Sequence, residues 1–451
     1  MQTKDKYRTA PVPSRRIPGG IPYIIGNEAA ERFSFYGMKG ILTVFMTQYL
    51  IDSDGQSDVL SEENAKVWYH LFTMAVYFTP FFGALLSDIF IGKYKTILSL
   101  SVIYCLGHLA LGLDETRTGL TVGLTLIAIG SGGIKPCVSA HVGDQFGKTN
   151  QHLLGKVFGW FYFSINLGAF LSTLLTPWLL AHEDFGPHWA FGVPGFLMLL
   201  ATICFWAGRH KFVHVPPGGK GFVKEVFNRE GLKIIGKLSI IYLFVSVFWS
   251  LFDQTGSAWV LQAEKMDRHL FGVELLSSQI QAANPLLVMI LIPVCSYLLY
   301  PALNRAFELT PMRKILIGFF ITTGAFTLSA LIEARIDMGE TPSIVWQLLA
   351  YFILTTAEVM VSITCLEFSY TQASNKMKSF IMSLFMISIA LGNGITAFVN
   401  NFIQNPDGTT KLEGADYYWF FTGLMFATAI LFIFVAVFYK EKTYIQDEDP
   451  G

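Results

Sequence analysis

Charged residues are scarce in this sequence, and their scarcity restricts the class of protein. Only 14% of the 451 residues are Asp, Glu, Lys or Arg, whereas 52% are hydrophobic. An ordinary soluble protein carries about a quarter charged residues. A soluble core of this size could not bury so much apolar surface, so the composition predicts a protein embedded in lipid.

Net charge and cysteine content are low as well. The formal net charge is −1, so no basic field favours nucleic acid or another anionic partner. The five cysteines all lie in apolar segments, and their spacing fits neither a metal site nor a disulfide framework. We expect them to be small packing residues. The basic N-terminal stretch is followed by no small-residue cleavage site, so no removable signal is predicted.

Long apolar segments predict twelve membrane-spanning helices, since about 20 predominantly apolar residues cross a bilayer. The expected spans are about 22–50, 65–91, 95–113, 118–141, 154–181, 189–208, 232–262, 278–303, 313–333, 343–372, 377–403 and 417–439. The longest internal connection, 209–231, separates six spans from six. We therefore expect an all-α membrane protein with one six-helix bundle at 1–208, a linker at 209–231 and a second bundle at 232–451.

The positive charges predict the orientation. With the N-terminus in the cytoplasm, most of the 32 Lys and Arg residues fall in cytoplasmic pieces. The external loops hold only Lys66, Arg117, Lys265, Arg268, Arg335 and Lys411. Cytoplasmic loops are normally enriched in Lys and Arg, so the pattern supports twelve spans with both termini inside. Two such bundles joined by a cytoplasmic linker are the architecture of the major facilitator superfamily, and the stretch 83–88 (GALLSD) resembles its loop between helices 2 and 3.

Ionisable side chains inside the predicted spans are the candidate functional residues. Each costs about 2.5–3.5 kcal/mol at a bilayer centre, so its presence needs a reason. They are Glu28, Glu31, Arg32, Lys39, Lys135, Asp253, Glu358 and Glu367. The structural reasons are a helix end that lies nearer the membrane surface or a fixed ion pair that holds helices together, and the functional reason is an aqueous cavity. Glu358 lies nine residues before Glu367, on the opposite side of an ideal helix, and we favour a structural role for it.

The first span gives the clearest indication of a cavity. Glu28, Glu31, Arg32, Tyr36 and Lys39 form one stripe at helical spacing. Lipid cannot accept that stripe, so it is predicted to face water inside the bundle. Two acids beside one guanidinium leave one carboxylate imperfectly paired, and such a group suits a proton carrier.

Five ordered motifs resemble the proton-coupled oligopeptide transporter family. They are 28–37 (EAAERFSFYG), 132–136 (GGIKP) with 143–146 (GDQF), 161–168 (FYFSINLG), 248–254 (FWSLFDQ) and 367–372 (EFSYTQ). The resemblance runs over most of the chain. It implies a symporter that imports di- and tripeptides by alternating access, in a minimal twelve-helix form of the major facilitator fold.

The resemblance also implies a role for each candidate residue. Proton coupling falls to Glu28, Glu31, Arg32 and His70. Substrate binding falls to Arg32, Tyr36, Tyr77, Lys135, Tyr162, Asn166, Trp249, Asn284 and Glu367. The gate pairs are Lys39 with Asp253 on the external side and Lys135 with Glu367 on the cytoplasmic side. The peptide carboxylate would lie near Arg32 and Lys135, and its amino group near Glu367.

Three positions depart from the family pattern and bear on side-chain preference. Phe35 replaces a tyrosine, Lys39 an arginine and Phe385 a tryptophan. The expected partners are short peptides, peptide-like drugs, protons and membrane lipid, with no metal or cofactor. We expect a monomer in the cell membrane and no enzyme activity. The alternatives are a carrier of nitrate, another anion or amphipathic drugs, and a membrane-embedded enzyme or receptor, for which the sequence offers no catalytic motif.

Overall fold

The computed structural model describes residues 7–372, 378–405 and 409–439, and these are almost entirely helical. The first half contains α1 (Ile21–Gln48), α2 (Glu62–Leu85), the π-helical turn η1 (Leu86–Ile91), α3 (Lys93–Leu113), α4 (Arg117–Asp144), the 3₁₀ turn η2 (Gln151–Leu153), α5 (Leu154–Ala181) and α6 (Gly186–Ala207). The 3₁₀ turn η3 (Gly208–His210) and α7 (Gly219–Val226) lie in the predicted linker.

The second half is more interrupted. It contains α8 (Arg229–Phe252), the 3₁₀ turn η4 (Asp253–Gly256), α9 (Ala258–Glu264), the hairpin β1 (His269–Leu270) and β2 (Val273–Glu274), the 3₁₀ turn η5 (Ser277–Ala282), α10 (Ala283–Val294), the π turn η6 (Cys295–Leu299), α11 (Tyr300–Ala306), α12 (Pro311–Asp337), α13 (Val345–Glu358), the π turn η7 (Val359–Ile363), α14 (Thr364–Gln372), α15 (Lys378–Ile403) and α16 (Ala415–Phe438).

Side-chain caps explain where several helices begin. Ser61, Thr116, Asn228 and Thr310 each accept a hydrogen bond from a backbone N–H in the first turn of α2, α4, α8 and α12. An N-cap of this kind satisfies a donor that the helix itself leaves without a partner. Four of the predicted spans therefore begin within a few residues of a polar residue that caps the helix.

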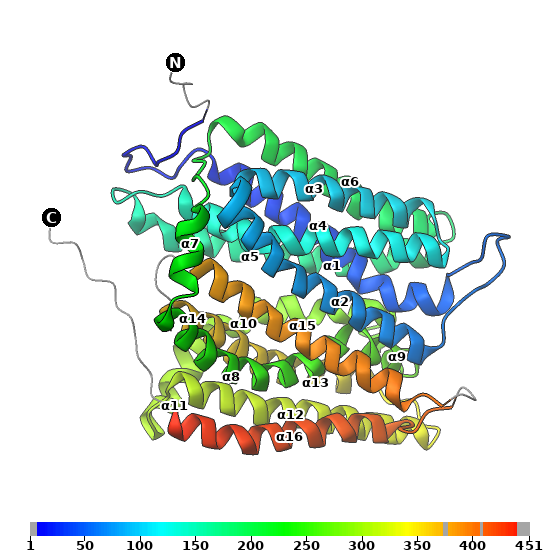
Figure 1. The fold of residues 1–451 in the computed structure, drawn as a ribbon. Coiled ribbons are helices and arrows are strands. Elements are labelled where there is room, and N and C mark those ends of the chain that lie inside the picture. The colour runs from blue at the N-terminus through cyan, green and yellow to red at the C-terminus, as the bar shows by residue number, and fades with distance from the viewer. Residues whose placement is uncertain (1–6, 373–377, 406–408, 440–451) are drawn as a thin grey trace.

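Eleven stretches of the described residues are long and apolar enough to cross a membrane. The exception is α1, whose 28 residues include Glu28, Glu31, Arg32 and Lys39. These charges depress the hydropathy of α1, although it runs alongside the other long helices (Figure 1) and packs on α5 and α6. The predicted all-α membrane fold is confirmed.

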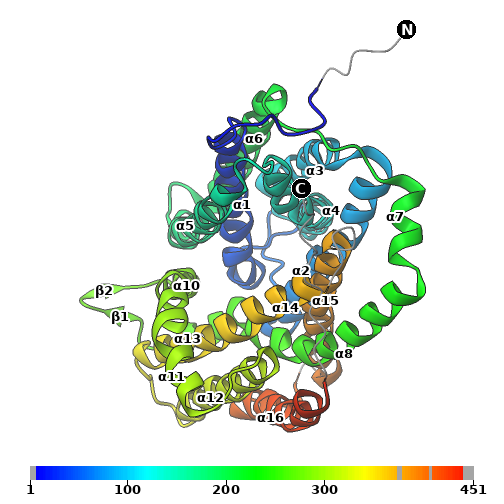
Figure 2. The ribbon, with the colours of Figure 1, turned by 90° about the vertical axis from the view of Figure 1, so that its left-hand side faces the viewer.

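The two halves lie one above the other in Figure 1, and the described chain begins and ends at the same end of the bundle. In the end-on view of Figure 2, α1 and α3–α6 occupy one side and α8 and α10–α16 the other. The long helices α2 and α15 pack directly across the boundary. The linker touches both halves, since Gly218 N–H donates to Asp88 O at 2.7 Å while Val226 packs in the core of the second half.

The glycine-rich stretch of α4 has a packing role. A Cβ on Gly132 would overlap Thr79 of α2, and a Cβ on Gly133 would overlap Leu100 of α3. The glycines therefore let α4 approach α2 and α3 closely. Lys135 lies just beyond them, and its ammonium faces an aromatic ring, Phe35, at 3.7 Å from the centroid. Close helix packing accounts for these glycines.

Candidate functional site

Four charged side chains form a cluster where α1 meets α4, and all but Arg32 are buried. Arg32 Nε lies 2.7 Å from Glu28 Oε1 and 3.3 Å from Glu31 Oε2. Lys135 Nζ approaches Glu31 Oε1 to 3.7 Å, and both side chains are 3% exposed. Ser131 Oγ donates to the same carboxylate oxygen at 3.3 Å. Two acids and two bases balance one another, which is how ionised groups persist away from water.

The cluster agrees with the expected grouping of charges on α1 but gives Lys135 a different partner from the one expected. Glu28, Glu31 and Arg32 lie together as their helical spacing predicts. Lys135 contacts Glu31 in this conformation, and among the described residues no ion pair joins it to Glu367, whose side chain is exposed. Glu31 thus shares its two oxygens between the guanidinium of Arg32 and the ammonium of Lys135.

The second predicted pair is closed. Lys39 Nζ donates to Asp253 Oδ1 at 2.8 Å, and both side chains are buried. Lys39 belongs to α1, whereas Asp253 begins η4, where the helix that started as α8 tightens into a 3₁₀ turn. The bond therefore joins the two halves, at the end of the bundle away from Tyr7 and Tyr439.

His70 is part of the same network. Its Nδ1 lies 2.7 Å from Asn393 Oδ1 and its Nε2 lies 2.8 Å from Ser257 Oγ. Asn393 Nδ2 donates to Asp253 Oδ2 at 2.7 Å, so the amide oxygen is the atom that faces His70. Nδ1 must then carry a hydrogen. In the neutral ring Nε2 accepts from the Ser257 hydroxyl, and protonation of the ring would reverse that bond.

Further hydrogen bonds join the halves at the same end. They run from Thr43 Oγ1 to Gly256 O, from Gln48 Nε2 to Glu264 Oε1, from Gln281 Nε2 to Gly40 O and from Gln279 Nε2 to Leu174 O, at 2.7–2.9 Å. Gly256 also requires the absence of a side chain, because a Cβ there would overlap Tyr69. This end of the structure is closed.

A cavity of about 290 Å³ lies between the halves. The predicted residues in its lining are Tyr36, Lys39, Tyr77, Tyr162, Asn166, Trp249, Asp253 and Asn284. Phenol, indole and amide groups surround the space, so it offers hydrogen bonds to a polar solute and aromatic walls to its side chains. Phe385, one of the three departures from the family pattern, also lines it.

Glu358 lines the cavity too, which its expected structural role does not anticipate. Its Oε2 accepts a hydrogen bond from Asn284 Nδ2 at 2.7 Å, and the side chain is half-buried. Between Glu358 and Glu367 lies the π turn η7. A π turn rotates the chain less per residue than an α turn, so the two carboxylates are not related as on an ideal helix.

Sequence reasoning missed Asn393 and Ser257. Asn393 is an amide in the middle of an apolar span and lies between Gly392 and Gly394. A Cβ on Gly392 would overlap Ser246 O of α8, so the glycine brings α15 against α8. The signal was therefore a buried amide beside a close-packing glycine. Ser257 carried no such signal, because its role depends on where the helix breaks.

Membrane helices in two halves, ion pairs between the halves and a polar cavity among them are the arrangement of a secondary transporter. Comparison with known proteins agrees. The profile of the POT family matches residues 94–230 and 223–420. The chain belongs to the POT family, and the predicted resemblance is confirmed.

Similar proteins are transporters. The chain is 37% identical over 383 residues to "Peptide transporter family 1" of Drosophila melanogaster, covering 75% of this chain and 50% of that protein. It is 35% identical over 369 residues to human "Solute carrier family 15 member 2", covering 71% and 49%. The chain thus spans about half the length of these relatives.

Solved structures confirm the major facilitator type of fold. An auto inhibited POT family peptide transporter is similar with a TM-score of 0.83 and 34% identity, over 96% of this chain and 99% of that chain. The POT family transporter PepTSo is similar with a TM-score of 0.82 and 35% identity, over 94% and 98%.

Removal of the Asn393 amide should loosen the closed end. Asn393→Ala leaves Asp253 Oδ2 and His70 Nδ1 without their partner, and an unpaired buried polar group costs about 1–3 kcal/mol. The population should shift toward states in which the halves separate at this end. Spin labels at Asp54→Cys and Glu340→Cys, in a background without the native cysteines, should report a longer distance.

Asn400→Ala is the matched control. Asn400 lies on the same helix, and its amide nitrogen donates within that helix to Thr396 O. The control should keep the wild-type distance distribution. An unchanged distance distribution in Asn393→Ala would show that the hydrogen bonds of Asn393 to His70 and Asp253 do not hold this end of the bundle closed.

Proposed function

We propose that this chain is a proton-coupled symporter that imports di- and tripeptides by alternating access. The observation that carries the proposal is the polar, aromatic cavity between the halves, together with a balanced cluster of two acids and two bases. The cluster lies outside the lining, and its Arg32 is one turn of α1 from Tyr36 in the cavity wall. The similar proteins are named peptide transporters. Protons are the coupling ion and no other cofactor is invoked. The chain acts as a monomer in the cell membrane, with both termini in the cytoplasm.

Coupling follows from competition for Glu31. A proton on Glu31 weakens its hold on Lys135, whose ammonium then becomes free for the peptide carboxylate or for Glu367. Lys135 and Glu367 belong to different halves, as do Lys39 and Asp253. Each pair forms fully only when its own end of the bundle is closed, so formation of one accompanies separation of the other. In the present conformation the Lys39–Asp253 pair is formed.

The peptide is held by its two ends. Its carboxylate lies near Arg32 and Lys135, and its ammonium near Glu367, with Asn166 and Asn284 available to the backbone. The side chains lie against Tyr36, Tyr77, Tyr162 and Trp249. Recognition of the termini fixes orientation, so aromatic walls can accept different side chains.

Glu31→Gln should abolish concentrative uptake and spare exchange. A neutral amide cannot carry the proton, but the peptide site remains. Proteoliposomes with an inward proton gradient should no longer accumulate labelled dialanine, while counterflow of dialanine persists. Glu28→Gln should behave in the same way.

Glu333→Gln is the control for this loss. Glu333 is also a buried carboxylate, 5% exposed, but it accepts from Gln262 in the second half. Its variant should still accumulate dialanine. The coupling role of α1 would be wrong if both Glu28→Gln and Glu31→Gln concentrated peptide under the gradient.

Substrate length should show a sharp limit. Two charged ends held at a fixed separation match dipeptides and tripeptides, whereas a free amino acid is too short and a tetrapeptide too long. Unlabelled dialanine and trialanine should compete for uptake, and alanine and tetra-alanine should compete poorly. Equal inhibition by alanine and dialanine would contradict recognition of both ends, even if uptake itself remained proton-driven.

Glu358 and Glu367 can be separated by blocking the peptide amino group. If Glu367 binds the peptide ammonium, wild type should prefer dialanine over N-acetyl-dialanine, which has no ammonium. Glu367→Gln should lose this preference, because its neutral amide cannot form the ion pair. Binding competition measures the preference in each variant. If only Glu358→Gln lost this preference, Glu358 in the cavity wall, and not Glu367, would bind the peptide ammonium.

A further inference from the structure

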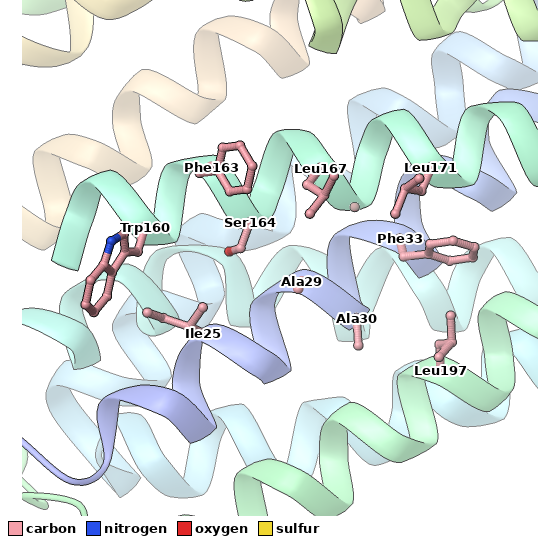
Figure 3. A pocket seen from close by; sticks show the side chains of 11 residues that line it. Ile25, Ala29, Ala30, Phe33, Trp160, Phe163, Ser164, Leu167, Leu171 and Leu197 are labelled. Carbon is pink, nitrogen blue, oxygen red and sulfur yellow. The ribbon is translucent and has the colours of Figure 1, made fainter. Parts of the chain in front are cut away.

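An apolar groove of about 430 Å³ runs along the outer face of the first half. It lies between α1, α5 and α6 (Figure 3), and is lined by Ile25, Ala29, Ala30, Phe33, Trp160, Phe163, Ser164, Leu167, Gly168, Leu171 and Leu197. Ser164 is the one side chain in this lining with a hydroxyl group, and that hydroxyl donates to Phe161 O at 2.7 Å. Apart from the indole N–H of Trp160 at one end, the rest of the lining is apolar, so the groove suits a hydrocarbon chain better than a solute from water.

Small residues make the groove concave. Gly168 packs against α1 so closely that a Cβ there would lie 2.6 Å from Ala29 O. Beside this contact Ala29 and Ala30 form the floor, while Phe163 and Leu171 project outward, with exposures of 55% and 48%. A membrane-facing helix surface needs no such hollow to contact lipid.

The length of the groove matches one leaflet of a bilayer. Trp160 and Leu171 lie at its two ends on α5 (Figure 3), and their separation of eleven positions corresponds to about 16 Å at 1.5 Å per residue. The hydrocarbon core of a bilayer is about 30 Å thick, so the groove spans about half of it. A single acyl chain that enters from one surface fits this depth.

Cations and aromatic rings surround the end near Trp160. Lys156 Nζ lies 5.1 Å from the centre of the Trp160 ring. Lys211 Nζ donates to the Tyr23 hydroxyl at 2.9 Å, and Tyr23 lies about two turns before Ala30 of the groove floor on the same side of α1. Both lysines are exposed, and within the described part of the chain neither forms an ion pair with a carboxylate. Aromatic rings and basic side chains at this depth mark the polar surface of a membrane, and such cations attract anionic headgroups.

We propose that this groove binds one acyl chain of an anionic phospholipid, whose phosphate group lies between Lys156 and Lys211. The site is separate from the peptide cavity. Ala29, Ala30 and Phe33 lie on the face of α1 turned away from Glu28, Glu31 and Arg32. The assignment therefore stands on its own geometry and does not rest on the proposed transport activity.

The test uses the full chain in lipid nanodiscs of phosphatidylcholine that contain a phosphatidylglycerol with a photoreactive diazirine midway along one acyl chain. After illumination, mass spectrometry maps the labelled residues. Labelling should concentrate on the groove, at Phe33, Leu167 and Leu171. Unlabelled phosphatidylglycerol should suppress it more strongly than phosphatidylcholine.

Two variants probe the headgroup and the groove separately. The double variant Lys156→Gln with Lys211→Gln should reduce groove labelling several-fold. Lys314→Gln is its control, because Lys314 also lies over an aromatic ring, Tyr300, at 4.5 Å, but outside the groove. Ala30→Leu should fill the floor and reduce groove labelling, whereas Leu431→Phe on the exposed face of α16 should leave it unchanged.

Several outcomes would overturn the proposal. Equal suppression by the two lipids, or equal labelling of wild type and the double lysine variant, would reduce the groove to ordinary lipid contact. Labelling as dense on α16 as on α5 would mean the same. Crosslinks between two copies of α5 would make the groove a contact between protein chains. Because these variants change surface groups, loss of folding is checked by size-exclusion elution of each protein before reconstitution.

Discussion

Charge neutrality inside lipid is the constraint on which the rest of this structure depends. An isolated ionised group in a low-dielectric interior is prohibitively costly, so each must have partners. Two of the pairs join different elements: Lys135 of α4 neutralises Glu31 of α1, and Lys39 of α1 neutralises Asp253 of η4. The same requirement that allows these groups in the membrane therefore also positions α1, α4 and η4. A buried pair contributes little net stability, but loss of one partner is costly for the charge that remains. Without Lys39, Asp253 would lose its ion-pair partner. By contrast, Glu31 without Lys135 would keep Arg32.

Breaks in helical regularity occur beside the charged and polar residues. The 3₁₀ turn η4 begins at Asp253, and the π turn η7 follows Glu358 directly. Non-helical backbone at membrane depth is tolerated where protein or water satisfies its polar groups, and π turns are frequent at functional sites. At η4 the altered backbone lets Gly256 O accept from Thr43 and lets Ser257 reach His70. The irregular segments thus serve the contacts between the halves.

Apolar length predicted the spans well, because the thickness of the bilayer fixes it and the sequence displays it directly. The grouping of Glu28, Glu31 and Arg32 on one face of α1 could also be predicted, since they interact within one helix. Contacts between distant segments were less accessible. Asn393 meets His70 across 323 residues, and the contact of Lys135 with Glu31 joins two different helices. The direction in which Glu358 faces was harder to predict for a related reason: the π turn after it changes the helical rotation and depends on packing that one sequence does not show.

The back of α1 limits how the first half can move. Gly168 of α5 lies against Ala29 O, and Gly37 of α1 has room for no Cβ beside Thr176 and Ser172. Backbones this close cannot slide past one another without side-chain overlap, so α1 and α5 should move as one body in the proposed alternating-access cycle. The groove between them would then keep its shape through the cycle. A ligand shifts an equilibrium only by its difference in affinity for the two states, so a lipid in this groove should stabilise the first half without favouring either state.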